Sequence, residues 1–199
     1  LTPPGWAWRM DAPAEPQRGG TGNTGTARFE FTPMAPGWHI TMGPGGVLYA
    51  ATSRAEGRFV LEGEMIYFAD GARSAEWGVA VGGNGLDGNA ASWLAFVVRD
   101  DGKAAVLRHQ NGQTTPVMDW TAHDAIRSRD STGFTRNRVA VRAEPDSVRL
   151  VVNATVIRAW PRSALEVNGH YGFRIGKQAN LHITNLDLTQ RLAPFPARR

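Results

Sequence analysis

Two carboxylates stand at alternate positions in a segment with the composition of a β-strand, the run Phe59–Phe68. Glu62 and Glu64 point to the same side of such a strand, because side chains alternate between its two faces. A pair of carboxylates on one face can hydrolyse a glycosidic bond, one as nucleophile and one as proton donor. The set is incomplete here, since Ile66 or Tyr67 stands where a further acid would be needed. The alternative is a solvent-facing strand whose other face packs in the core (Leu61, Met65 and Tyr67).

Arginine and tryptophan side chains are the other candidate ligand contacts. Arginine forms directional, charge-assisted hydrogen bonds that suit sugar hydroxyls and uronic acids. We expect a binding face that combines the two carboxylates with outward arginines: Glu62, Glu64, Arg99, Arg108, Arg142 and Arg174. Trp120 is the candidate for stacking on a sugar ring, because a polar loop follows it. Core or edge packing is the alternative for the other tryptophans.

Several catalytic and metal-binding patterns are absent from the sequence. There is no cysteine, which excludes disulfides, thiolate metal ligands and thiol catalysis. The five histidines lack metal-ligand spacing, and no Gly-x-Ser-x-Gly motif marks a serine nucleophile. The glycine-rich segment 82–89 lacks the spacing of an EF-hand and predicts a hairpin loop. No standard catalytic motif is therefore recognised.

The charge distribution limits the classes of partner. The formal charge is +4, and 20 of the 22 basic residues are arginines spread along the chain. Nucleic-acid-binding proteins usually concentrate such charge on one face, so we expect no nucleic-acid partner. Apolar runs such as 94–98 are too short to cross a bilayer. The start at Leu1 followed by Thr-Pro-Pro-Gly-Trp suits a mature terminus after signal cleavage, and we expect an extracellular or periplasmic protein. A segment cut from a longer chain would look the same.

The elements that must position these residues are short β-strands. From residue 28 onward, β-rich segments alternate with turn residues at intervals of roughly 8–15, which is typical of sandwiches and barrels. Two hairpins are predicted, 93–110 around Asp-Asp-Gly-Lys and 138–153 around Glu-Pro-Asp-Ser. Apolar residues alternate with polar or small ones in 139–142, 148–152 and 171–175, so each strand has one core face.

The sequence thus predicts an all-β domain, a two-sheet antiparallel β-sandwich with one or two short helices. The helical candidates are 118–126 and 161–165, where Pro161 suits the first position of a helix. We expect a Pro/Gly-rich lead-in over 1–27, the sandwich over 28–190 and a loose tail over 191–199.

The last strands resemble those of concanavalin A-like domains. The resemblance rests on the runs 137–141, 148–153, 167–175 (Val-Asn-Gly-His-Tyr-Gly-Phe-Arg-Ile) and 182–188, with 37–49 in the N-terminal half. The resemblance covers about 29–189. The chain is also similar to bacterial secreted domains related to 3-keto-disaccharide hydrolase-like and laminin G-like domains. One departure is Asn153-Ala154 in place of Asn-Gly. Alanine is strained at a position with positive φ, so we expect a wider turn there.

The resemblance implies a concanavalin A-like jelly roll that is exported and binds carbohydrate on a concave sheet. It leaves activity open, because this fold hosts lectins, glycosidases and inert modules. Glucanases of the superfamily carry a Glu-x-Asp-x-x-Glu pattern, which Glu62 and Glu64 match only in part. A glycoside hydrolase or lyase with an atypical carboxylate site is one alternative, and a structural or protein-binding module is the other. The family also implies a structural calcium, for which Glu30 and Asp187 are the candidate ligands. The sequence does not indicate the ligand or the oligomeric state.

Overall fold

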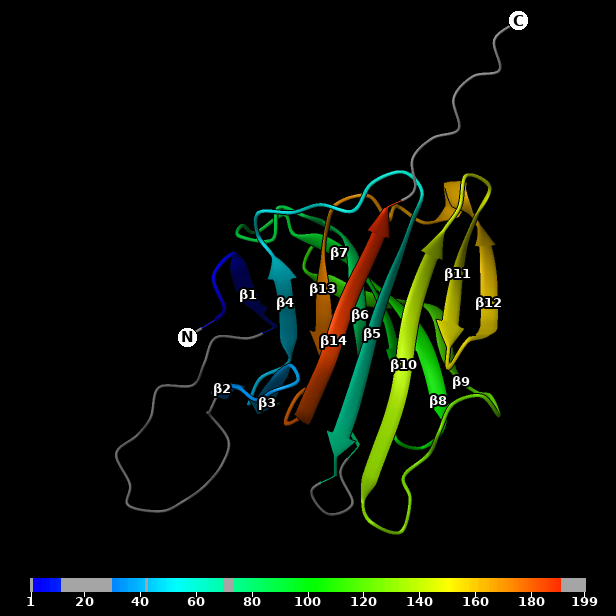
Figure 1. Cartoon of the computed structure of the whole chain (residues 1–199). Helices are drawn as coiled ribbons and strands as arrows, with labels where there is room; N and C mark the ends of the chain where they lie inside the picture. The colour runs from blue at the N-terminus through cyan, green and yellow to red at the C-terminus, as the bar shows by residue number, and fades with distance from the viewer. Residues whose placement is uncertain (1, 12–29, 42, 70–73, 191–199) are drawn as a thin grey trace, which may run out of the picture.

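The computed structural model describes residues 2–11, 30–41, 43–69 and 74–190. Their strands form two antiparallel seven-stranded sheets that pack face to face as a sandwich (Figure 1). Sheet A has the order β1-β4-β13-β6-β7-β8-β9, and sheet B has the order β12-β11-β10-β5-β14-β3-β2. The all-β sandwich predicted from the sequence is confirmed.

Sheet A lies behind sheet B in Figure 1. Its strands, in chain order, are β1 (Trp6–Met10), β4 (Gly46–Ala50), β6 (Trp77–Asn84), β7 (Ser92–Val98), β8 (Lys103–Gln110), β9 (Gln113–Ala122) and β13 (His170–Ile175). Strand β1 comes from the segment that we expected to be a lead-in, so the described sandwich also includes residues 6–10.

Sheet B contains the other strands: β2 (Glu30–Pro33), β3 (Trp38–Thr41), β5 (Phe59–Phe68), β10 (Phe134–Ala143), β11 (Ser147–Val152), β12 (Thr155–Pro161) and β14 (Asn180–Gln190). A short 3-10 helix, η1 (Arg162–Ala164), follows Pro161 and matches one of the two helical candidates. The tail 191–199 lies outside the described residues.

The core lies between the sheets because apolar and polar residues alternate along most strands. In β5, for example, Leu61, Met65 and Tyr67 are buried between the sheets. Strand β13 contributes Phe173 and Ile175 from the other sheet. The residues between these positions point to the outer face of each sheet, away from the core. This alternation, predicted from the sequence, decides which side chains can meet a ligand.

Two local predictions were wrong. The candidate helix 118–126 is largely strand, because residues up to Ala122 pair with β8 as the edge strand β9. The turn at 153–154 is not widened, since β11 ends at Val152 and β12 begins at Thr155. Asn153 and Ala154 both have positive φ, 49° and 70°, as a tight two-residue hairpin turn requires.

Candidate functional site

The outer face of sheet A has small residues at its centre. Neighbouring strands bring Gly172 opposite Ala80, and Ala80 opposite Ala95. The residues of this face form an apolar cluster separate from the main core, and it includes Trp93 from β7 and Leu86 from the β6–β7 connection. Small side chains leave space above the sheet that larger neighbours from the rim can fill.

A pocket of about 300 Å³ lies at one end of sheet A. We call it the end pocket. It is formed by the ends of β6, β7 and β8 together with η1 and the segment that follows it. Its lining residues are Gly82, Ser92, Trp93, Leu94, Arg108, His109, Gln110, Ser163, Ala164 and Glu166. The volume is at the lower end of the range for small-molecule sites.

Trp93 and His109, which are among the residues lining the end pocket, stack their rings on the outer face of sheet A. Trp93 and His109 are opposite each other in the β7–β8 hairpin. Their ring centroids are 3.7 Å apart and their planes differ by 11°. The next strand fixes the imidazole, because the Oγ1 of Thr114 lies 2.9 Å from the Nδ1 of His109. The orientation of this ring pair is therefore set by the three adjacent strands β7, β8 and β9.

Burial and nearby arginines favour the neutral form of His109 by lowering its pKa. Burial lowers the pKa of His109 most, and the positive charges of Arg9 and Arg174 lower it further, although Asp11 opposes them. A neutral imidazole has one nitrogen that donates and one that accepts hydrogen bonds. The ring pair can thus offer one hydrogen-bond donor and one acceptor beside the apolar ring of Trp93.

Arg9 of β1 contacts Trp93 and the β6–β7 connection. Its guanidinium lies 5.8 Å from the centroid of the Trp93 ring. Its Nη1 donates hydrogen bonds to the carbonyl oxygens of Leu86 at 2.8 Å and Gly88 at 2.7 Å. These contacts join the β6–β7 connection to the N-terminal strand above the outer face of sheet A.

One wall of the end pocket comes from η1 and the segment that follows it. The Nη2 of Arg108 donates to the carbonyl oxygen of Ala164 at 3.0 Å and so ties β8 to η1. The carboxylate of Glu166 accepts a hydrogen bond from the backbone N–H of Asn168 at 2.9 Å. Arg108 and Glu166 therefore give the end pocket one positive and one negative group.

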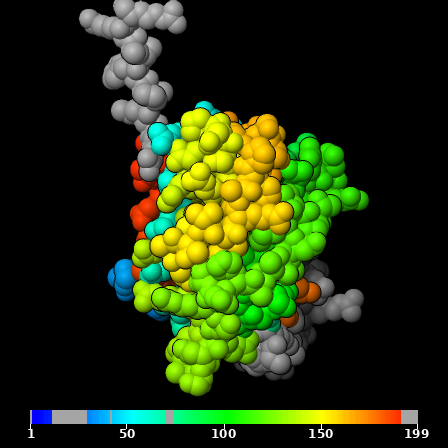
Figure 2. All heavy atoms as spheres, turned by 90° about the vertical axis from the view of Figure 1, so that its right-hand side faces the viewer, coloured from blue at the N-terminus to red at the C-terminus, as the bar shows by residue number. Residues whose placement is uncertain are grey.

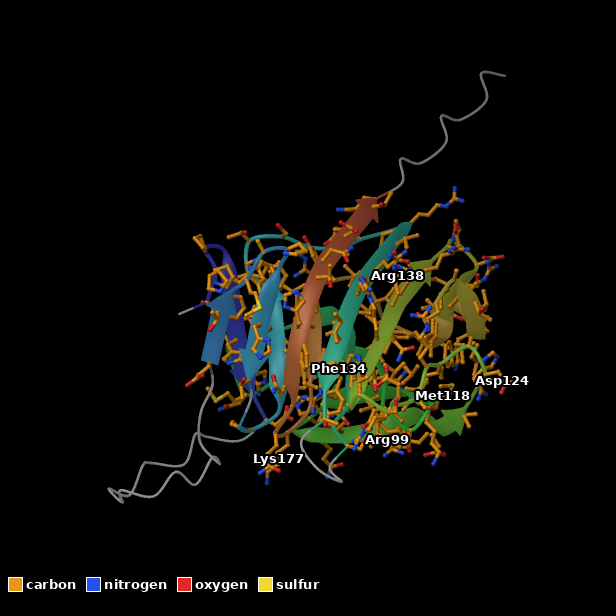
Figure 3. All side chains as sticks on the ribbon, turned by 60° about the horizontal axis from the view of Figure 1, so that its bottom comes forward. Arg99, Met118, Asp124, Phe134, Arg138 and Lys177 are labelled. Atoms are coloured by element: carbon orange, nitrogen blue, oxygen red, sulfur yellow. The ribbon has the colours of Figure 1, made fainter. Side chains whose placement is uncertain are left out.

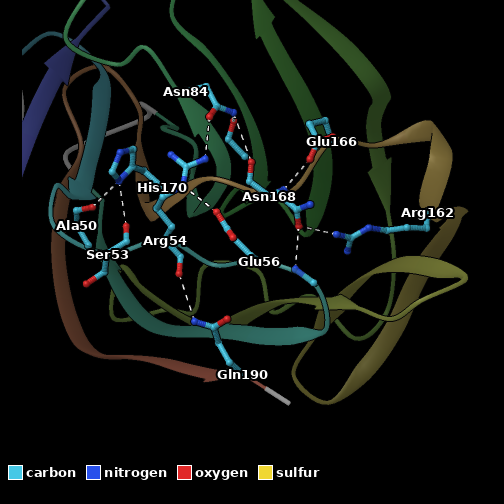
Figure 4. A network of polar contacts seen from close by, with 12 residues as sticks. Ala50, Ser53, Arg54, Glu56, Asn84, Arg162, Glu166, Asn168, His170 and Gln190 are labelled. Carbon is cyan, nitrogen blue, oxygen red and sulfur yellow. Dashed lines mark hydrogen bonds and ion pairs between the residues drawn. The ribbon is translucent and has the colours of Figure 1, made fainter. Parts of the chain in front are cut away.

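A polar network behind this wall holds it in place (Figure 4). The Oδ1 of Asn168 accepts hydrogen bonds from the Nη2 of Arg162 at 2.7 Å and from the backbone N–H of Gly57 at 3.1 Å. The Nδ1 of His170 lies 3.0 Å from the carbonyl oxygens of Ala50 and Ser53, so this nitrogen carries the proton. The network connects the loop after β4 with the loop before β13.

The structure places three more of the predicted site residues at sheet A, at a distance from the end pocket. Arg99 and Trp120 lie towards the other end of β8. The Arg99 guanidinium is 4.1 Å from the centroid of the Trp120 ring and also pairs with Asp101. Arg174, nearly buried, binds Asp11 at 2.7 Å and Glu76 at 2.8 Å. Burial works to lower the pKa of Arg174, but these two carboxylates raise it above its usual value. Of the predicted arginines, Arg108 alone lines the end pocket.

The predicted carboxylates lie on the other sheet. Glu62 and Glu64 point to the outer face of sheet B, where Arg138 from β10 contacts both of them (Figure 3, where Arg138 is labelled). Arg136 also donates hydrogen bonds to Glu64. Burial alone would raise the pKa of Glu64, but the hydrogen bonds from both arginines outweigh it and lower the pKa. A carboxylate held in its ionised form is poorly suited to act as a general acid.

Arg142 also belongs to sheet B, so the predicted binding set does not gather on one surface. Glu62, Glu64 and Arg142 lie on the outer face of sheet B, whereas Arg99, Arg174 and Trp120 lie on the outer face of sheet A and Arg108 points to the inner side of sheet A. Strand order could not be read from local alternation, and this is why the sequence grouped residues of two opposite faces.

Strand register also separates the two candidate calcium ligands. Glu30 is opposite Thr41, which is opposite Asn180, whereas Asp187 is opposite Glu62. The seven residue steps from Asn180 to Asp187 span about 23 Å at 3.3 Å per residue. Calcium ligands lie within about 2.6 Å of the ion, so Glu30 and Asp187 cannot hold the same ion. No cluster of three or more metal-ligating side chains occurs among the described residues.

Sequence reasoning missed most of the end pocket. The sequence predicted a packing role for Trp93, and this residue is only 5% exposed. It did not pair this ring with His109, although both lie in a predicted hairpin. Gly102 with φ 78° closes a short loop that puts Arg99 opposite Lys103, and this register brings the two rings together. Glu166 and Ser163 gave no signal, because they lie in η1 and the irregular segment after it, outside the strands.

No family model and no curated protein matches the sequence. In structure, the chain is similar to the carbohydrate-binding module CBM66 from Bacillus subtilis, with 10% identity and a TM-score of 0.63 over 94% of this chain and 96% of that one. It is also similar to a Bacillus licheniformis β-glucanase, with 12% identity and a TM-score of 0.59 over 96% and 95% of the two chains.

A third similar structure is the alginate lyase A1-II′, with 12% identity and a TM-score of 0.59 over 94% of each chain. At such identities the similarity concerns the fold alone. The observed architecture agrees with the resemblance that residues 167–175 suggested. The chain has a concanavalin A-like jelly-roll fold.

Proposed function

We propose that this protein is an exported carbohydrate-binding module and that the end pocket binds a glycan. The observation that carries the proposal is the stacked ring pair of Trp93 and His109, which lies at the same end of sheet A as the polar side chains of the end pocket. Sugars have both apolar C–H faces and hydroxyl groups, so their sites combine an aromatic surface with directional polar groups.

Each part of the end pocket has a place in this proposal. Trp93 is buried, and its ring supports the half-buried His109 on the outer face of sheet A. Arg108 and Gln110 extend from β8 as hydrogen-bond donors. Glu166 accepts hydrogen bonds from hydroxyl groups. The small volume suits one or two sugar rings, so we expect recognition of a chain end or a short segment.

Binding fits the site better than glycoside hydrolysis. The standard mechanisms need two carboxyl groups on either side of the scissile bond. Among the described residues that line the end pocket, Glu166 is the one carboxylate. Glu62 and Glu64 stand on the outer face of sheet B and are bound by arginines.

The test is calorimetric titration with oligosaccharides of neutral glucans and fructans and with oligouronates. We expect one panel member to bind, and His109→Ala and Glu166→Gln each to weaken its binding by about tenfold or more, as loss of a charge-assisted bond or a stacking surface predicts. Glu62→Gln, on the other sheet, is the matched control and should bind like the original protein. A loss confined to Glu62→Gln would transfer the site to sheet B, and no binding in either class would refute the proposal.

Export is a separate part of the proposal. Among the described residues, no helix is long and apolar enough to span a membrane. Fractionation of cells that express the complete reading frame should recover the protein outside the cytoplasm, and a purely cytoplasmic product would contradict export.

A further inference from the structure

Two arginines stand opposite each other on the outer face of sheet B. Arg142 of β10 pairs with Arg149 of β11 in the antiparallel register. Both point away from the core, because their neighbours Val141 and Leu150 are buried between the sheets. Side chains at directly opposed positions are about 5 Å apart at Cβ, and like charges there destabilise a sheet.

Neither guanidinium has an ion-pair partner among the described residues. Both side chains are half-buried, and the Nε of Arg142 is buried without a hydrogen-bond acceptor. A buried donor that lacks an acceptor carries a desolvation cost. The arrangement is thus unfavourable in two respects unless an acceptor with negative charge is added.

The carboxylates nearby are occupied. Glu62 is diagonal to Arg142 across β5 and β10, but it pairs with Arg138 at 3.5 Å. Glu144, two residues after Arg142, pairs with Arg58. The remaining neighbours in the sheet, such as Val60 opposite Arg142 and Ala159 opposite Arg149, have no charge. The arginine pair therefore differs from the other arginines on this face, which have carboxylate partners.

We propose that Arg142 and Arg149 form a binding site for a tetrahedral oxyanion, as a free sulfate or phosphate or as its ester. Guanidinium groups present several N–H donors in a fixed plane and bind such anions through paired hydrogen bonds. A bound oxyanion neutralises the like-charge pair and supplies the acceptor that the Nε of Arg142 lacks. In Figure 2, β11 and β12 (yellow and orange) form part of the surface that faces the viewer, which is the β12 edge of the sandwich.

This site is distinct from the end pocket, because neither arginine is among the residues that line the pocket. The test compares the urea midpoint of the full chain in sodium sulfate and in sodium chloride at equal ionic strength. An anion that binds only the folded state stabilises it by RT ln(1 + c/Kd), where c is the free anion concentration, and so raises the midpoint as that concentration increases. We expect sulfate to stabilise the original protein and Arg149→Gln to weaken sulfate binding by about tenfold.

Two further variants make the result specific. Arg127→Gln removes the same charge from an exposed loop and should keep the full sulfate response. Arg149→Glu places a carboxylate opposite Arg142, and it should stabilise the protein in chloride and abolish the sulfate response. An equal sulfate response in all four proteins would overturn the proposal, as would an Arg149→Glu protein that is less stable than Arg149→Gln in chloride.

The source of the oxyanion is identified in separate arms with dextran sulfate, vesicles that contain phosphatidic acid, and inorganic sulfate alone. Arg149-dependent binding of dextran sulfate, with neutral dextran as the control, assigns the site to a sulfated polysaccharide. Arg149-dependent binding of the vesicles assigns it to a lipid headgroup. A response to inorganic sulfate alone supports a free ion.

Discussion

At the scale of single residues, His109 links the candidate site to pH. Its pKa lies below the usual value of 6.5, because burial and two arginines disfavour the imidazolium. Between the two pKa values the unfolded chain binds more protons than the folded one, so stability rises with pH there. The contribution of neutral His109 is complete above about pH 6.5 and is lost as the pH falls through the folded-state pKa.

We therefore expect the difference in unfolding free energy between the original protein and His109→Gln to shrink as the pH falls from 8 to 5. Urea unfolding at several pH values measures this difference, and the other four histidines are present in both proteins. A constant difference across that range would contradict the assigned pKa.

At the scale of elements, the β11–β12 turn is held by its own side chain. The Oδ1 of Asn153 accepts a hydrogen bond from the backbone N–H of Arg138 at 2.9 Å, and its Nδ2 donates to the carbonyl oxygen of Ala125 at 2.8 Å. It also donates to the buried Asn137 at 2.7 Å. These bonds fix the position of the turn, and Ala154 must then adopt a positive φ.

Ala154→Gly should accordingly stabilise the protein by about 0.5–1 kcal/mol. Glycine avoids the cost of about 1–2 kcal/mol for a left-handed alanine, and its greater freedom in the unfolded chain offsets part of this gain. Denaturant titration provides the measurement. Ala159→Gly, the same change within β12, is the control and should be destabilising, so a loss of stability in both variants would refute the strain at Ala154.

At the scale of the whole molecule, β1 closes one end of the sandwich. The ring of Trp6 stacks on Phe173 of sheet A at 5.8 Å and meets Trp38 of sheet B edge-on at 5.6 Å. A residue that contacts both sheets contributes to holding them together, although β1 is an edge strand.

We predict that Trp6→Ala lowers the unfolding free energy by about 3 kcal/mol, the lower end for aromatic truncation in a core, because Trp6 is half-buried. Phe134→Ala is the matched control: Phe134 is 47% exposed and touches Phe68, so its loss should cost less than about 1 kcal/mol. Equal costs measured by urea unfolding would show that β1 does not hold the sheets together.

The sequence by itself determined most of the strands and their faces, although it missed β1 and β9. Alternation in 148–152 and 171–175 is a local property of the chain, and it correctly assigned Leu150 and Phe173 to the core. The short helix after Pro161 and the positive φ of Gly102 followed from equally local preferences. The motif of 167–175 also identified the jelly roll.

Only the tertiary structure decided which faces belong together. Strand order is set by packing between segments far apart in the chain, and no local pattern states that β5 lies on the sheet opposite β8. The carboxylates of β5 therefore could not be separated from Arg108 by sequence alone. Strand register likewise brought Trp93 to His109 and Arg142 to Arg149, because a shift of one residue turns a side chain to the other face.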